Sequence, residues 1–260
     1  MFFDYFDMLT GEAIYVDEVG HLRSPKLSEL KPTSGIGYAV YNLYLNFLSW
    51  DKEHLLKYAQ IMQYKGVDKL SNKPKLTAFD IVTLLPQTRE LCRGALSFFM
   101  LEELVWDEKS RRYLSVISED DTMTCYGEID RGNFENIRGL MLQMNYINLD
   151  MDDAPIATHT SEKTKELWER AQKALREQSE SAKKEDKPEY HLSNIISKLC
   201  SIHPTYNILN IFDLTIFQLY DAFFQVSYMR GIDMNERIFS NHGGENFRFE
   251  NWLKPVIKNV

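Results

Sequence analysis

The sequence predicts a mainly α-helical protein with a small antiparallel β-sheet, an α+β fold class, and a helical C-terminal module. Three observations lead to this class. Apolar residues recur at helical spacing in several segments, β-favouring runs separated by polar turns occupy residues 97–129, and a charged stretch precedes an aromatic C-terminal part. We therefore expect an N-terminal α+β domain over 1–158, a charged connecting helix or linker over 159–187, and a C-terminal helical module over 188–260.

The first 50 residues are expected to form a hairpin and then a helix. Residues 2–19 contain two apolar runs on either side of Thr10-Gly11, a turn signal that predicts two short strands. The later segment YAVYNLYLNFLSW predicts a largely buried helix, because its apolar residues form a wide stripe at helical spacing.

Capping residues predict two further helix starts. Asp51 can cap a helix that runs to about Tyr64, because its carboxylate can accept from a free backbone N–H group. Thr77 with Asp80 resembles the start of another helix, which Pro86 interrupts because proline lacks the N–H that a helix interior needs.

The apolar period changes after residue 97. SFFMLEELVW and RRYLSVI flank the polar stretch DEKSR, which predicts a β-hairpin, and TMTCYGEI is expected to add a third strand. Asn133 then fits the N-cap of an amphipathic helix. We expect the apolar face of that helix to pack on the protein's own sheet and helices. Its residues are Phe134, Ile137, Leu140, Met141 and Met144.

Residues 160–187 read as a solvated helix. They are mostly good helix formers, and oppositely charged residues lie four apart, as in Glu166 with Arg170 and Glu169 with Lys173. The apolar stripe is thin, so the segment is expected to connect two bodies. A partly disordered linker is the alternative.

The C-terminal module is expected to contain two helices. HLSNIISKLC places Leu192, Ile195, Ile196 and Leu199 on one face. In FDLTIFQLYDAFFQVSYMRG, Thr215 and Gln218 fit a capping box, and Gly231 is expected to end the helix. This helix has two apolar stripes, so it lies in the middle of a bundle or offers one face to a partner.

Composition excludes several classes of protein. The formal net charge of −8 argues against a general nucleic-acid binder, which needs clustered Lys and Arg. No apolar run approaches the roughly 20 residues of a membrane span, and the N-terminal residues lack the basic start of a signal peptide. Three separated cysteines form no C-x-x-C pair, which favours free thiols in a reducing cytosol.

No catalytic, cofactor-binding or metal site is expected. Asp107-Glu108-Lys109 loosely matches the acidic-Lys arrangement of Mg²⁺ nucleases, but it falls where the hairpin should turn. Asp152-Asp153 reads as a loop, and Gly35-x-Gly37 lacks the third glycine of a dinucleotide site. His242-Gly243-Gly244 resembles an oxyanion-hole stretch without the G-x-S-x-G nucleophile turn.

Three stretches together resemble a known group of proteins. They are VGHLRSPKLSEL followed by IGYAVYNLYLNFLS, then GEIDRGNFENIRGLMLQMNYI, and finally LTIFQLYDAFF followed by FENWL. In this order they resemble tail-assembly chaperones, or closely associated tail proteins, encoded in the tail-gene region of phages and prophages of Gram-positive bacteria. The motifs are structural, and no frameshift junction typical of many tail chaperones is visible.

The resemblance implies a helical, non-enzymatic protein of the host bacterial cytoplasm that binds tape-measure or tail-tube subunits before assembly. Grooves between apolar helices would cover the amphipathic helices of the partner. Met141, Met144 and Met151 could adapt to such helices, although filling gaps in the core is the favoured interpretation. The alternatives are a structural tail or baseplate component and a phage protein that engages a host defence protein.

For partner contact we expect the exposed aromatic face of the helix over residues 214–229. Its residues are Phe217, Phe224 and Tyr228, with Trp252 nearby. The sequence does not predict the oligomeric state.

Overall fold

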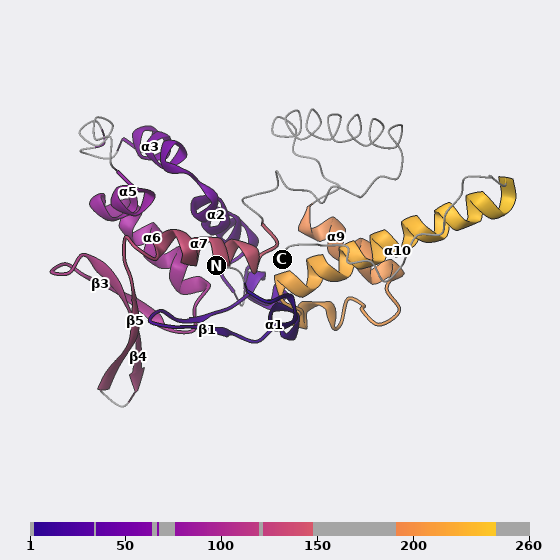
Figure 1. Cartoon of the computed structure of the whole chain (residues 1–260), viewed down its shortest axis with the longest axis horizontal. Helices are drawn as coiled ribbons and strands as arrows, with labels where there is room; N and C mark the ends of the chain where they lie inside the picture. The colour runs from indigo at the N-terminus through magenta and orange to yellow at the C-terminus, as the bar shows by residue number, and fades with distance from the viewer. Residues whose placement is uncertain are drawn as a thin grey trace. The chain divides into compact units, whose positions relative to one another are not determined.

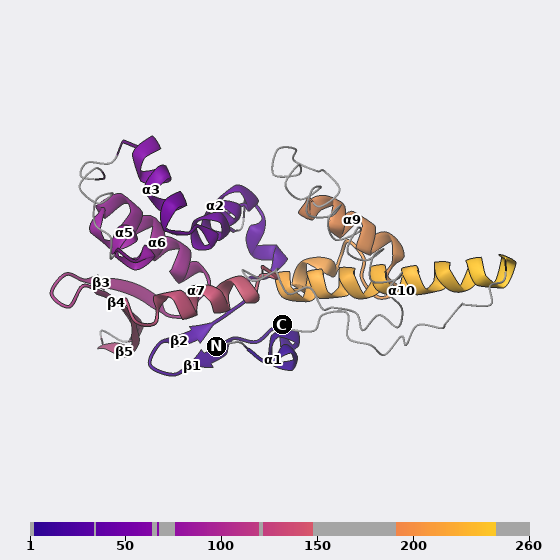
Figure 2. The ribbon, with the colours of Figure 1, turned by 45° about the horizontal axis from the view of Figure 1, so that its top comes forward.

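The structure of the protein is a computed structural model (Figures 1 and 2). The residues that it describes are 3–33, 35–63, 67, 76–119, 122–147 and 191–242. These residues confirm the predicted α+β class, with mostly helices and two small antiparallel sheets. The charged segment 159–187 lies outside the described residues, so the predicted domain bounds stay predictions.

The chain divides into two compact units. The N-terminal unit contains Met1–Leu149 and, from much later in the sequence, Phe212–Asp221. The C-terminal unit contains Asp150–Ile211 and Ala222–Asn259. Residues 212–221, which the sequence analysis places in the C-terminal module, therefore pack with the N-terminal part of the chain.

The first element is a helix, and the predicted pair of strands around Thr10-Gly11 is wrong. Helix α1 spans Tyr5–Thr10 and begins at Asp4, whose carboxylate accepts from the N–H of Phe6 at 2.8 Å. Gly11 has φ of +73° and donates its N–H to Met8, which ends the helix. Glycine with a positive φ is typical of helix ends and of hairpin turns alike, so Thr10-Gly11 alone does not distinguish the two.

The N-terminal hairpin lies a few residues further on. Strand β1 (Ile14–Val16) pairs antiparallel with β2 (Gly20–Leu22). The hairpin joins the second sheet through its backbone, because the N–H of Glu128 donates to the carbonyl of Glu18 at 2.8 Å. At Gly127 the two backbones approach so closely that a Cβ atom would lie 2.2 Å from the carbonyl oxygen of Glu18.

A buried carboxylate holds the other side of this hairpin. The side chain of Glu102 has no exposed surface, and its Oε1 lies 2.6 Å from Nδ1 of His21. The same carboxylate accepts from the backbone N–H of His21 at 2.9 and 3.0 Å. Gly20 leaves room for it, since a Cβ there would lie 2.8 Å from the Glu102 carboxylate. These hydrogen bonds compensate for the loss of water around a buried charge.

Five helices form the larger part of the N-terminal unit. They are α2 (Tyr38–Ser49), α3 (Lys52–Ile61), α5 (Ala78–Leu84), α6 (Pro86–Phe98) and α7 (Phe134–Gln143). The predicted caps are confirmed: Asp51 accepts from the N–H of His54 at 2.9 Å, and Thr77 and Asp80 form a capping box. Pro86 begins α6, where a missing N–H has no cost.

The predicted three-stranded sheet is also confirmed. Strands β3 (Glu103–Asp107), β4 (Arg112–Glu119) and β5 (Thr122–Ile129) pair antiparallel in the order β3-β4-β5. A register shift between Ser115 and Val116 interrupts the β4–β5 ladder. Helices α2, α3, α5 and α6 lie to one side of this sheet in both views (Figures 1 and 2).

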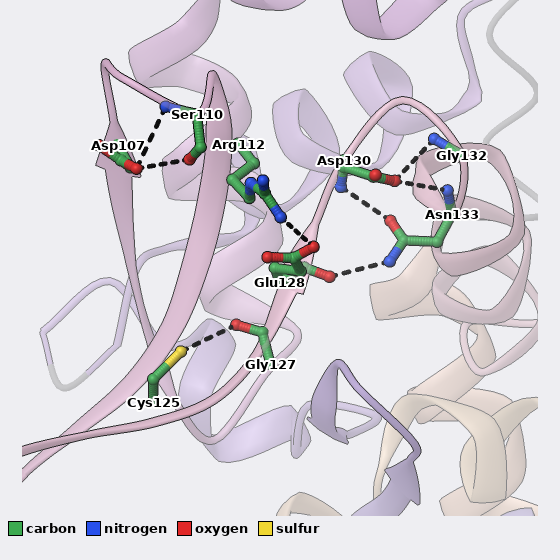
Figure 3. A network of polar contacts seen from close by, with 9 residues as sticks. All are labelled: Asp107, Ser110, Arg112, Cys125, Gly127, Glu128, Asp130, Gly132 and Asn133. Carbon is green, nitrogen blue, oxygen red and sulfur yellow. Dashed lines mark hydrogen bonds and ion pairs between the residues drawn. The ribbon is translucent and has the colours of Figure 1, made fainter.

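Polar side chains fix the connection from β5 to α7 (Figure 3). Asn133 occupies the predicted N-cap position, but its side chain makes no capping bond to the helix. Instead its amide accepts from the N–H of Asp130 at 2.9 Å and donates to the carbonyl of Glu128 at 2.8 Å. The Asp130 carboxylate accepts from the N–H groups of Gly132 and Asn133, so it orders the turn that precedes the helix.

The apolar face of α7 belongs to the core, as predicted. Phe134, Ile137, Leu140, Met141 and Met144 are each 2% exposed or less. The ring of Phe134 lies 5.4 Å from that of Phe79 in α5. Met141 and Met144 are therefore core residues rather than an adaptable surface, whereas Met151 lies outside the described residues.

Two helices are described in the C-terminal part of the chain. Helix α9 (Leu192–Ile202) buries three residues of the predicted face, Leu192, Ile195 and Leu199, whereas the fourth, Ile196, is half-buried. Helix α10 spans Ile216–His242, so the predicted end at Gly231 is wrong. A helix tolerates an interior glycine at a cost of about 1 kcal/mol, so Gly231 alone does not end it.

Replacing Gly127 by Ala tests the close approach of the hairpin to β5. We expect Gly127→Ala to lower the free energy of unfolding by about 3 kcal/mol, because the new Cβ would overlap backbone atoms that cannot move independently. Gly139→Ala in α7 is the matched control, since its Cβ would meet nothing within 4 Å. Denaturant unfolding followed by circular dichroism measures both, and equal stabilities would contradict the prediction.

Candidate functional site

Residues Phe212–Asp221, here called the docking segment, enter the N-terminal unit by backbone pairing. They begin within the short helix η4 (Ile211–Asp213). The N–H of Leu27 donates to the carbonyl of Leu214, and the N–H of Ile216 donates to that of Pro25, both at 2.9 Å. Thr215 pairs with Lys26 as an isolated bridge and, with Gln218, forms the predicted capping box.

Phe217 is a core residue, which corrects the prediction that it lies on an exposed face. It has no exposed surface, and its ring lies 6.0 Å from that of Tyr5 and 4.9 Å from that of Tyr146. Its N–H donates to Oγ of Ser24 at 3.2 Å. The N-terminal unit covers both apolar stripes of α10 at this first turn, since Ile216 and Leu219 are also fully buried.

A buried aspartate closes the docking segment. Oδ1 of Asp221 accepts from the hydroxyl of Tyr5 at 2.5 Å and from that of Tyr146 at 3.3 Å. Burial raises the pKa of Tyr146, so its hydroxyl keeps its proton and remains a donor at neutral pH. Neither contact was predicted. The available signal was a single aspartate within the mostly apolar run IFQLYDAFF, because a buried carboxylate requires a hydrogen-bond donor.

Beyond the docking segment, α10 presents an apolar face. Phe224, Tyr228, Gly231 and Met234 succeed one another at spacings of four and three residues, so they fall within about 120° of one side of the helix. Phe224 is 38% exposed, Met234 is 60% exposed and Tyr228 is half-buried. We call these four residues the α10 face. The predicted Trp252 lies outside the described residues.

The α10 face has the spacing of a helix that binds in a groove. Amphipathic helices that lay one side against a partner place anchors at positions such as i and i+4, which Phe224 and Tyr228 occupy here. Methionine adapts its shape to different partners, and Met234 is the most exposed residue of the four. The sequence analysis named Phe224 and Tyr228 for this surface but missed Met234, which lies beyond the glycine expected to end the helix.

The acidic residues named in the sequence do not converge on a metal site. Asp107 is the last residue of β3, and its carboxylate accepts from the hydroxyl and N–H of Ser110 (Figure 3). It also accepts from the N–H of Lys109. These hydrogen bonds hold the pKa of Asp107 below its usual value, and the bond from the Ser110 hydroxyl has the largest effect. Glu108 pairs with Arg89 at 2.9 Å. Among the described residues, no group of three His, Cys, Asp or Glu side chains could hold a metal ion.

The remaining sequence candidates are turns or lie elsewhere. Gly37 has φ of +81° and precedes the first residue of α2, where it serves as the N-cap. His242 is the last residue of α10, and the two glycines after it lie outside the described residues, as does Asp152-Asp153.

The three cysteines differ in their surroundings, and this predicts their reactivity. Burial raises the pKa of Cys92 to about 12, Cys200 is half-buried with its pKa raised by burial, and Cys125 is exposed on β5. Because the thiolate is the reactive form, we expect iodoacetamide at neutral pH to label Cys125 first, Cys200 more slowly, and Cys92 only on unfolding. Peptide mass spectrometry over time measures the order. Rapid labelling of Cys92 in the folded protein would refute it.

Comparison with known proteins gives one partial match. Residues 182–256 match the family model described as the YomV second domain. This family is of the phage or prophage type, since YomV comes from a Bacillus prophage. No curated protein and no solved structure matches the chain. Among the described residues, no helix has the length and apolar character that crossing a membrane requires. The chain thus contains, within residues 182–256, a segment similar to a phage-type domain that includes all of α10.

Proposed function

We propose that the protein is a non-enzymatic, phage tail-assembly chaperone-like protein of the host cytoplasm. It binds tape-measure or tail-tube subunits before they assemble. The observation that carries this proposal is the α10 face, an exposed apolar side of a long helix within a segment that matches a phage-type domain.

The chemistry of this face suits a helical partner. Tape-measure chains carry amphipathic helices whose apolar sides must be covered until the tail tube forms around them. Phe224 and Tyr228 supply aromatic area, and Met234 supplies an adaptable apolar side chain next to Gly231, where a partner helix can approach the backbone. Helix-in-groove docking of this kind needs no cofactor and no catalytic residue.

The surroundings of the face favour selective over unspecific binding. Charged residues follow the apolar ones along α10, and Asp233, Glu236 and Arg237 are exposed. In such an arrangement the apolar residues form the centre of the interface and the charged residues form its rim. A partner with complementary charges then binds in one register.

Two methionines on opposite sides of α10 provide a matched test. Met234 belongs to the α10 face, whereas Met229, 40% exposed, lies about 140° around the helix from both Phe224 and Met234. We expect Met234→Glu to reduce recovery of the partner at least tenfold, because it places a charge within an apolar contact. Met229→Glu should leave recovery unchanged. The measurement is an affinity pull-down of the tagged protein from infected or induced cells, quantified by mass spectrometry.

The identity of the recovered protein decides between the alternatives. A tape-measure or tail-tube protein, with the bait absent from finished virions, supports the proposal. Persistence of the bait in purified virions would mean a structural tail or baseplate component instead. A host protein as the dominant partner would mean a role in host defence, and equal loss with both glutamate variants would exclude the α10 face as the contact.

The nuclease interpretation of the β3–β4 turn has its own test. We expect the double variant Asp107→Ala and Lys109→Ala to recover the same partner in the same amount, because neither residue belongs to the α10 face. The matched measurement is circular dichroism, which shows whether the variant keeps the fold. Loss of function with the fold preserved would return an enzymatic role to consideration.

A further inference from the structure

Helix α10 changes its surroundings along its length. Its first six residues, Ile216–Asp221, belong to the docking segment and are largely buried in the N-terminal unit. The rest continues through the α10 face to His242. Starting a helix is unfavourable because several residues are ordered for the first hydrogen bond, whereas each later residue adds one bond. A helix whose start is held by tertiary contacts avoids the cost of nucleation.

The continuation of α10 is more exposed than its first turns. Among the described side chains from 222 to 237, Ile232 is the one that is buried. The sequence there is a poor helix former, since it contains β-branched and aromatic residues, Ser227 and Gly231. We therefore expect the docked turns that precede it to contribute to its helical order.

Asp221 lies at the junction between the two parts. It is three residues before Phe224 and is 9% exposed, and its carboxylate accepts from Tyr5 and Tyr146. The second contact to α1 comes from Gln218, whose Nε2 donates to the carbonyl of Leu9 at 2.9 Å. Without the hydroxyls of Tyr5 and Tyr146, the buried carboxylate of Asp221 would lose these donors. The contact between the first turns of α10 and the N-terminal unit would then be less stable.

We infer that the docking segment is the helix nucleus on which the α10 face depends, and that Tyr5 and Tyr146 act as positioning residues by holding Asp221. This rests on the proposed function, because the α10 face is the surface assigned there to the partner. The N-terminal unit thereby regulates binding: the apparent affinity falls with the fraction of molecules in which the face is helical.

Hydrogen exchange of the full chain tests the inference without a partner. We expect Tyr5→Phe, which keeps the ring beside Phe217, to speed amide exchange about tenfold both in 218–221 and in 224–234, as loss of one charge-assisted hydrogen bond would. Tyr15→Phe is the matched control, because Tyr15 lies in the same unit and is 54% exposed. Exchange in α6 should be unchanged in both variants, which separates local from global unfolding.

A second substitution distinguishes helix nucleation from general loosening. Gly231→Ala raises helix propensity, and its Cβ would meet nothing within 4 Å. In the Tyr5→Phe background it should restore most of the lost protection in 224–234. Faster exchange confined to 218–221, no change in either segment, or no rescue by Gly231→Ala would each overturn the inference.

The hydrogen-exchange experiment and the pull-down test separate claims, so either can be refuted without the other. If Met234→Glu abolishes recovery of the tail protein but the exchange pattern is absent, the proposed function stands without this regulation. If the exchange pattern holds and Met234→Glu has no effect on recovery, the helix depends on its nucleus but the face is not the partner contact.

Discussion

The insertion of Phe212–Asp221 into the N-terminal unit is the contact on which the rest of the structure depends. Ile216, Phe217 and Leu219 are fully buried there, and each such side chain contributes about 2 kcal/mol relative to an exposed one. Backbone hydrogen bonds to Pro25 and Leu27 fix the orientation of the segment within this apolar contact. The entropy of closing a chain loop grows only slowly with its length, so a segment far along the sequence can complete this core.

A second constraint keeps the N-terminal hairpin against the larger sheet. Glycines at 20 and 127 let the hairpin backbone and the Glu102 carboxylate approach to distances that any Cβ would prevent. The buried carboxylate is tolerated because His21 donates to it from both backbone and ring. Close backbone approach and a satisfied buried charge thus replace the wide apolar contact that so small a hairpin cannot form.

The predictions that the structure confirms depend on local signals, whereas those that it corrects depend on contacts between distant segments. Caps, proline positions and strand alternation are local, so Asp51, Thr77 with Asp80, Pro86 and the three-stranded sheet appeared as expected. The glycines were misjudged, because Gly11 and Gly231 permit several backbone conformations and the neighbouring structure selects one of them. The docking contacts of Asp221 join residues more than 200 positions apart in one case, and no local pattern predicts such a pairing.

By itself the sequence determined the fold class, several helix starts and the apolar periodicity of α10. Phe217 and Phe224 lie seven residues apart and on the same side of that helix, so periodicity assigns them to one stripe. Only the tertiary structure decided that Phe217 is fully buried while Phe224 is 38% exposed. The physical reason is that periodicity reports which side chains share a face, whereas burial depends on whether another part of the chain reaches that face.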